Sequence, residues 1–177
     1  MNILCLLGSP RKNGNTAALL NSMIKGLNEN SKANIENVYL HGLQISPCSA
    51  CDACHILPDA ECAIKDDMQN LYPKVSKADV LVFATPIYWW NVSAQTKLFI
   101  DRLYGSHNLK GKKAILLMTY GGEAPNNGPE LIEKTFREIF EWVGIELIDV
   151  LGVYTGECHV KDNPEALEAS YKIGKNI

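Results

Sequence analysis

The stretch that decides the fold is Ile3-Leu4-Cys5-Leu6-Leu7-Gly8-Ser9-Pro10-Arg11-Lys12-Asn13-Gly14-Asn15-Thr16. Residues 3–7 form a short, unbroken apolar run, which is typical of a strand buried on both faces. Residues 15–27 then carry apolar side chains at helical spacing, so the polar residues between them form a strand-to-helix turn. This order predicts an α/β protein built on a parallel sheet.

The rest of the chain repeats the same alternation. We expect further strands at residues 35–40, 80–84, 114–118 and 145–153, and further helices at 66–77, 94–104, 129–143 and from Asn163-Pro164 onward. Pro73 is expected to kink or split the helix at 66–77. Five strands and five helices predict one domain, residues 1–177, with a doubly wound five-stranded parallel sheet of order 2-1-3-4-5. Ligands bind such sheets at the carboxyl ends of the strands, so the loops after the first, third and fourth strands should carry function.

Composition and charge exclude several classes of protein. The 177 residues fit a single domain, and 46% hydrophobic with 21% charged residues is an ordinary globular balance. The net charge of −3, without a long basic run, argues against a nucleic-acid partner. No basic leader and no apolar stretch of about 20 residues is present, so we expect a cytoplasmic protein without a membrane partner.

The first loop has the chemistry of a phosphate site. Gly14 permits a tight turn, hydroxyl and cationic side chains surround it, and a helix N-terminus adds partial positive charge. The loop lacks the Gly-Lys-Ser/Thr ending of a Walker motif and the G-x-G-x-x-G pattern, so a single terminal phosphate suits it better than a pyrophosphate. An ordinary polar turn with a helix cap is the alternative. The predicted phosphate-binding residues are Ser9, Arg11, Lys12, Gly14, Asn15 and Thr16.

The other two loops are suited to a planar ring. Three consecutive aromatic residues, Tyr88-Trp89-Trp90, follow the third strand and favour a platform for a ring or a partner subunit. The alternative is that these aromatics are buried in the core or in an interface. The paired glycines after the fourth strand permit close backbone approach, although a plain turn would also use them. The predicted ring-binding residues are Pro86, Ile87, Tyr88, Trp89, Asn91, Thr119, Tyr120, Gly121 and Gly122.

A cysteine-rich insert occupies residues 46–64, with the spacing Cys48-x₂-Cys51-x₂-Cys54-x₇-Cys62. Three cysteines at successive x₂ spacing can surround one compact metal–sulfur core, and the fourth can complete it, which favours a [4Fe–4S] cluster. Structural zinc usually uses two separated pairs. Zinc, reduced thiols without metal, and the c-type haem pattern Cys51-x-x-Cys54-His55 remain as alternatives.

Taken together, the three loops resemble the NAD(P)H-dependent FMN reductase branch of the flavodoxin-like proteins. The resemblance is carried by Gly8-Ser9-Pro10-Arg11 with Gly14-Asn15-Thr16, by Thr85-Pro86-Ile87-Tyr88-Trp89, and by residues 92–102. The cysteine insert, followed by Ile64-Lys65-Asp66-Asp67-Met68, is similar to that of the iron–sulfur flavoproteins. The resemblance implies a flavodoxin-like fold, FMN with its phosphate on the first loop and its isoalloxazine ring on the other two, and a homodimer or homotetramer.

These observations lead to one functional hypothesis and two alternatives. We expect an FMN-dependent oxidoreductase that transfers electrons through FMN and a [4Fe–4S] cluster, with a small redox donor or acceptor. No catalytic side chain is predicted, because the cofactors carry the chemistry. We also expect the cluster at the flavin end of the sheet, where a partner subunit's flavin would be nearer to it than its own. The alternatives are a cluster-free NAD(P)H-dependent FMN or quinone reductase and a non-catalytic zinc-binding or carrier protein.

Overall fold

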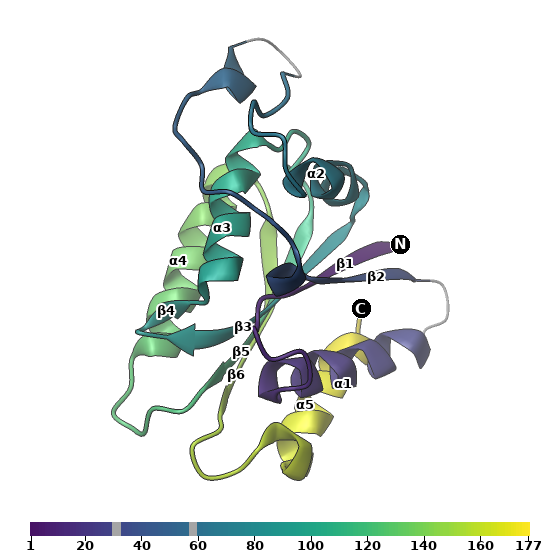
Figure 1. The fold of residues 1–177 in the computed structure, drawn as a ribbon. Helices are drawn as coiled ribbons and strands as arrows, with labels where there is room; N and C mark the ends of the chain where they lie inside the picture. The colour runs from purple at the N-terminus through teal and green to yellow at the C-terminus, as the bar shows by residue number, and fades with distance from the viewer. Residues whose placement is uncertain (30–32, 57–59) are drawn as a thin grey trace.

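The protein is a three-layer α/β sandwich (Figure 1). The computed structural model describes residues 1–29, 33–56 and 60–177. The strands are β1 (Asn2–Leu7), β2 (Asn34–Tyr39), β3 (Val80–Tyr88), β4 (Asn91–Val92), β5 (Lys113–Tyr120) and β6 (Glu146–Tyr154). The helices are α1 (Asn15–Glu29), α2 (Met68–Lys77), α3 (Ala94–Arg102), α4 (Gly128–Val143) and α5 (Pro164–Lys175). Residues 57–59, within the predicted cysteine insert, lie outside the described residues.

The sheet confirms the predicted topology. Its parallel strands follow the order β2-β1-β3-β5-β6, which is the expected 2-1-3-4-5 arrangement once the short β4 is set aside. Alternate side chains of β1 point to opposite faces of the sheet, and each face has its own hydrophobic core. Leu4 and Leu6 pack in the core under α2, α3 and α4. Ile3, Cys5 and Leu7 pack in the core under α1 and α5. Burial of both faces explains the unbroken apolar runs.

Two local predictions need correction. The third strand does not end at residue 84 but continues through Pro86 to Tyr88, and a turn then returns the chain as β4. Pro86 is tolerated there because the pairing of β3 with β1 ends at Ala84, so no neighbouring strand on that side requires an amide donor from residue 86. The helix containing Pro73 is not split: α2 runs unbroken over Met68–Lys77. Pro73 lies inside α2, as the sixth of its ten residues, where its missing amide removes one helical hydrogen bond without ending the helix.

No helix among the described residues is long and apolar enough to cross a bilayer.

Candidate functional site

The structure brings the three predicted loops together at the carboxyl ends of β1, β3 and β5. The amide of Gly8 donates to the carbonyl oxygen of Ala84 over 2.8 Å, which joins the first loop to β3. The hydroxyls of Thr16 and Thr119 lie 2.7 Å apart and connect the first loop to the end of β5. Pro86 of β3 is the register partner of Thr119. The predicted residues therefore form one contiguous region.

The first loop is folded tightly on itself. The amide of Arg11 donates to Ser9 Oγ over 3.1 Å, and the amide of Gly14 donates to the carbonyl oxygen of Arg11 over 3.0 Å. A Cβ atom at Gly14 would lie 2.9 Å from Arg11 Cβ, so a larger residue would force the loop open. The hydroxyl of Thr16 is occupied by Thr119, and Asn15 Oδ1 accepts from the amide of Val160 over 3.1 Å. Asn15 and Thr16 therefore offer a ligand chiefly their backbone N–H groups, which have no acceptor in the first turn of α1.

Positive side chains gather around this helix start. Arg11 and Lys12 are exposed on the loop, and a cavity of about 230 Å³ opens beside them. The cavity is lined by Arg11, Gly14, Asn15 and, from the segment after β6, His159 and Lys161. A helix N-terminus with basic side chains is a favourable place for an anion. Nothing in the spacing of residues links His159 and Lys161 to this loop, because only the fold brings them there.

The aromatic residues after β3 form an exposed hairpin turn. Tyr88 pairs with Asn91, and the two residues between them, Trp89 and Trp90, have φ of +50° and +57°. This is the pattern of a type I′ turn, which normally selects Asn and Gly. Trp89 is 90% exposed, so burial in the core does not explain these aromatics. The exposed aromatic surface at the ligand end of the sheet is consistent with a platform for a ring or a partner subunit.

The third loop adds an open space. A cavity of about 390 Å³ is lined by residues that include Tyr120, Gly122 and Tyr154. A Cβ atom at Gly121 would meet no atom within 4 Å, so the backbone there faces open space. The rings of Tyr120 and Tyr154 lie 6.0 Å apart and form one wall. This loop can accept a ligand against its backbone.

Sequence reasoning missed a buried hydroxyl network that fixes the start of the first loop. Ser93 Oγ donates to the carbonyl oxygen of Gly8 over 2.6 Å and lies 2.9 Å from Thr96 Oγ1. Thr96 in turn donates to Thr85 Oγ1 over 3.2 Å. A Cβ atom at Gly8 would lie 1.8 Å from Thr96 Oγ1, so the loop packs directly on α3. Ser93 directly before a helix is a recognisable N-cap, but its contact with Gly8 is not visible in the sequence.

The four cysteines of the insert differ in exposure. Cys54 and Cys62 are buried, whereas Cys48 and Cys51 are exposed. Burial raises the pKa of the Cys54 thiol, and the neighbouring thiols of Cys62, Cys48 and Cys51 raise it further. The pKa of the Cys51 thiol is lowered by hydrogen bonds from the amide of Ala53 and from Ser49. Within residues 1–29, 33–56 and 60–177, no three His, Cys, Asp or Glu side chains are assembled as a metal site.

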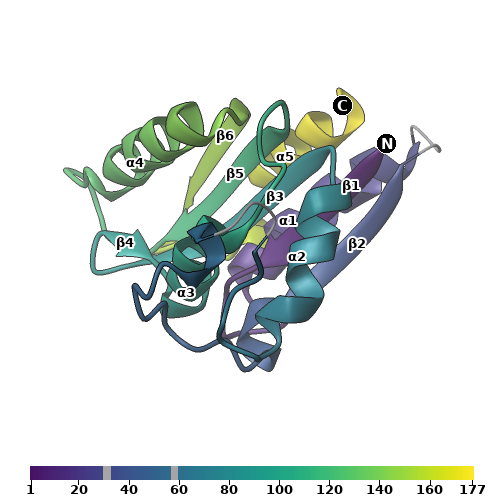
Figure 2. The same ribbon diagram turned by 90° about the horizontal axis from the view of Figure 1, so that it is seen from above.

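The cysteine insert does not lie at the end of the sheet where the sequence predicted it. Near the start of α3, Gln95 Nε2 lies 2.9 Å from His41 Nδ1. Farther along the chain, His55 Nε2 lies 2.7 Å from the carbonyl oxygen of Tyr104, beyond the end of α3. The chain leaving β2 thus follows the nine residues of α3, about 13 Å, toward the amino end of the sheet (Figures 1 and 2). The prediction was wrong because a segment without periodicity carries no signal for the helix that it follows.

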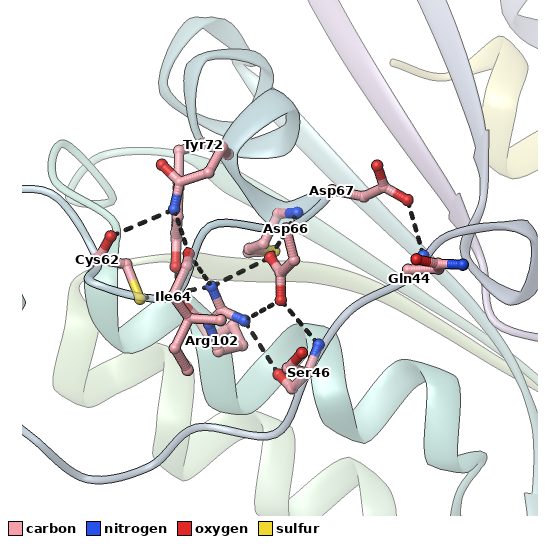
Figure 3. A network of polar contacts seen from close by, with 10 residues as sticks. Gln44, Ser46, Cys62, Ile64, Asp66, Asp67, Tyr72 and Arg102 are labelled. Atoms are coloured by element: carbon pink, nitrogen blue, oxygen red, sulfur yellow. Dashed lines mark hydrogen bonds and ion pairs between the residues drawn. The ribbon is translucent and has the colours of Figure 1, made fainter.

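A buried ion pair holds this insert in place (Figure 3). Arg102 Nη1 lies 2.7 Å from Asp66 Oδ2, and the Arg102 side chain is 1% exposed. Burial opposes ionisation of Asp66, but hydrogen bonds from Arg102 and from the amides of Ser46 and Met68 outweigh it and lower the pKa of this carboxyl. Tyr72 lies beside this ion pair, since its hydroxyl donates to the carbonyl oxygen of Arg102 over 3.1 Å. Its pKa is raised to about 12, first by burial and then by its contact with Cys62. The sequence did not single out Asp66, Tyr72 or Arg102 as site residues.

Comparisons with known proteins agree with this arrangement. A family model described as NADPH-dependent FMN reductase matches residues 1–148. An iron–sulfur flavoprotein of Archaeoglobus fulgidus is 34% identical over 181 residues, which cover 99% of this chain and 80% of that protein. An iron–sulfur flavoprotein of Methanocaldococcus jannaschii is 31% identical over 192 residues, covering 100% of this chain and 95% of that protein. The crystal structure of an azoreductase from Bacillus anthracis superposes with a TM-score of 0.79 at 15% identity, covering 100% of both chains, and supports the fold.

Proposed function

The chain belongs to the NADPH-dependent FMN reductase family and is thus a flavin-dependent oxidoreductase, and within this class we propose that it is an iron–sulfur flavoprotein. It would transfer electrons between FMN, a [4Fe–4S] cluster and a small redox donor or acceptor. The observation that carries the proposal is the set of four closely spaced cysteines in one insert, of which Cys54 and Cys62 are buried and Cys48 and Cys51 are exposed. We propose the cytoplasm as its location, where such thiols stay reduced.

We propose that the FMN phosphate binds at the first loop. The residues present fit this group, because the backbone amides at the start of α1 and the side chains of Arg11 and Lys12 supply donors and positive charge. Ser9 and Gly14 maintain the tight turn, and Ser93 holds its start by donating a hydrogen bond to the carbonyl oxygen of Gly8. The hairpin residues Tyr88 and Trp89 and the loop at residues 119–122 would orient the isoalloxazine ring and exclude water from one of its faces. Bound FMN supplies the hydride and single-electron chemistry.

The cysteine insert fits an iron–sulfur cluster by its donor set. Thiolates are soft ligands that suit iron–sulfur clusters, and Cys48, Cys51, Cys54 and Cys62 are the ligands that we propose. A guanidinium nitrogen, Arg102 Nε, is buried and has no hydrogen-bond partner in the described part of the chain. A sulfur atom of a bound cluster would supply the acceptor that this buried N–H group lacks. A bound cluster supplies single-electron transfer.

The insert lies about the length of α3 away from the first loop of the same chain. We therefore propose that the protein forms a homodimer or homotetramer in which the insert of one copy faces the flavin of another. Exposed apolar side chains at Trp89, Trp90, Leu131 and Trp142 support such an assembly.

The test is the iron and acid-labile sulfide content of anaerobically purified protein. We expect about four iron and four sulfide per chain, with a paramagnetic resonance signal after reduction. The Cys51→Ser variant should lose the signal and retain FMN, whereas Cys158→Ser, a cysteine outside the insert, should retain both. Iron-free protein under strict anaerobiosis would contradict the proposal, and one zinc per chain would support the zinc-binding alternative.

A second candidate is a cluster-free NAD(P)H-dependent FMN or quinone reductase. It is favoured by the cavity beside the first loop and by the exposed aromatic hairpin, because both would hold FMN without any contribution from the cysteine insert. Steady-state oxidation of NADH or NADPH by iron-free protein, at a rate unaffected by Cys51→Ser, would support this candidate over the first.

A further inference from the structure

Arg102 contacts both ends of the cysteine insert. Its Nη1 atom donates to the carbonyl oxygen of Ser46 over 3.0 Å, and its Nη2 atom donates to the carbonyl oxygen of Ile64 over 3.4 Å. Residues 46 and 64 are the first and last residues of the insert. One guanidinium at the end of α3 therefore holds two chain segments that are 18 positions apart in the sequence.

Asp66 completes the closure (Figure 3). Its carboxylate pairs with Nη1 over 2.7 Å and with Nη2 over 3.3 Å, and it also accepts from the amide of Ser46 over 2.8 Å. A buried charge is tolerated only when it is paired and hydrogen-bonded, so this pair resists opening. The planar fork of arginine can reach all these acceptors together, which the single ammonium of lysine cannot.

The same guanidinium contacts one of the cysteine sulfurs directly. Arg102 Nη2 donates to Cys62 Sγ over 3.4 Å, a distance that suits a hydrogen bond to sulfur. Cys62 is further restrained through its backbone, because Gln69 Nε2 donates to its carbonyl oxygen over 3.4 Å and to that of Ile64 over 2.7 Å. A Cβ atom at Gly105 would lie 3.5 Å from Cys62 Cβ, so the neighbouring turn packs closely against this cysteine.

We propose that Arg102 is a positioning residue: it closes the insert at residues 46 and 64 and holds Cys62 Sγ in a fixed, hydrogen-bonded position before any metal arrives. The closure is a property of the polypeptide itself. Its use in cluster binding rests on the proposed function, in which the N–H groups of Arg102 also donate to sulfur in the loaded protein. Hydrogen bonds to the sulfurs of a cluster are among the factors that set its reduction potential.

The first test uses metal-free, reduced protein. In the Arg102→Lys variant, we expect the alkylation rate of Cys62 by iodoacetamide to rise about tenfold or more, because loss of the closing hydrogen bonds lets the insert open and exposes this buried thiol to the reagent. Amide hydrogen exchange should rise in residues 46–56 and 60–64. Arg137→Lys is the matched control, because Arg137 pairs with Glu133 on the exposed surface of α4. Cys5, which is buried in β1, reports whether the whole domain has opened.

The second test uses reconstituted protein. Arg102→Lys protein that retains iron should have a lower midpoint potential than the wild type and a changed paramagnetic resonance spectrum, whereas Arg137→Lys should match the wild type. Should Arg102→Lys fail to fold, Asp66→Asn removes the partner of the guanidinium and should also increase exchange in the insert. Unchanged alkylation and exchange in the Arg102→Lys variant would overturn the proposal. If Arg102→Lys speeds alkylation but the wild-type protein binds no iron, the role of Arg102 in closing the insert is supported and the proposed cluster-binding function is rejected.

Discussion

At the scale of single residues, Arg11 provides the most direct test of the phosphate site. Arg11→Ala should weaken FMN binding about ten- to a hundredfold, since a hydrogen bond to a charged group contributes about 1.5–3 kcal/mol. Riboflavin, which lacks the phosphate, should bind both proteins equally well. Fluorescence titration of flavin-free protein measures both affinities, and Arg137→Ala on α4 should change neither. An equal loss of riboflavin affinity would show that Arg11 does not act through the phosphate.

The ionisation of Asp66 should make the free energy of unfolding depend on pH. Hydrogen bonds outweigh burial and lower its pKa in the folded state, so its contribution to stability is present above the ordinary carboxyl pKa. This contribution is lost as the pH falls through the lower, folded-state value. Asp66→Asn should reduce the free energy of unfolding by about 3–5 kcal/mol at neutral pH, because it leaves Arg102 buried without its counter-charge.

Urea unfolding at neutral and acidic pH checks this prediction. The difference between wild type and Asp66→Asn should shrink well below about pH 4, where the carboxyl groups become protonated. Asp162→Asn is the control, since that side chain is 62% exposed and should contribute little. A difference that stays constant from neutral to strongly acidic pH would contradict the role of an ionised Asp66.

At the scale of elements, the hairpin between β3 and β4 combines backbone strain with exposed aromatic surface. Left-handed conformation costs a non-glycine residue about 1–2 kcal/mol, while glycine costs about 0.5–1 kcal/mol in entropy. Trp89→Gly should therefore raise the free energy of unfolding by about 0.5–1 kcal/mol, because Trp89 has a φ of +50° and buries little surface. The same variant should weaken FMN binding if the indole contacts the ring.

Thermal unfolding and flavin titration separate these two effects. Asn108→Gly is a matched control, because Asn108 is also exposed with a φ of +63° but lies away from the three loops. It should leave FMN affinity unchanged. Loss of stability in Trp89→Gly would mean that the indole makes contacts outweighing the strain of its backbone.

The same hairpin shows what the sequence could predict at this scale and what it could not. Strands and helices with a clear period were predicted correctly, and the strand order followed from their alternation. The turn at Trp89-Trp90 was missed as a turn because tryptophan carries none of the usual turn chemistry. The path of the cysteine insert depends on long-range contacts, among them the ion pair of Asp66 with Arg102 and the contact of His55 with Tyr104, for which the spacing of residues gives no signal. The positions of the three loops were predictable because topology alone places them together.

At the scale of the whole molecule, the exposed apolar surface predicts self-association. Leu131 of α4 is 46% exposed and lines a cavity of about 270 Å³ together with Trp90. We expect a dimer or tetramer at micromolar concentration, measured by light scattering. Leu131→Glu should favour the monomer, because it would place a charge in a desolvated contact. Lys134→Gln, on the same helix but polar, should leave the assembly intact, and a wild-type monomer would refute the prediction.

The clasp that Arg102 forms between Ser46 and Ile64 also bears on how such chains diversify. The same side chain fixes the gap between these two residues, whatever the length of chain that spans it. Doubling the length of a flexible loop adds only about 0.6 kcal/mol to the entropy of closing it. Recombination can therefore replace the segment between Ser46 and Ile64 by another segment, with a different cysteine spacing or with no cysteines. A single ancestral scaffold can in this way give rise to descendants with and without a metal centre while its flavin end is inherited unchanged.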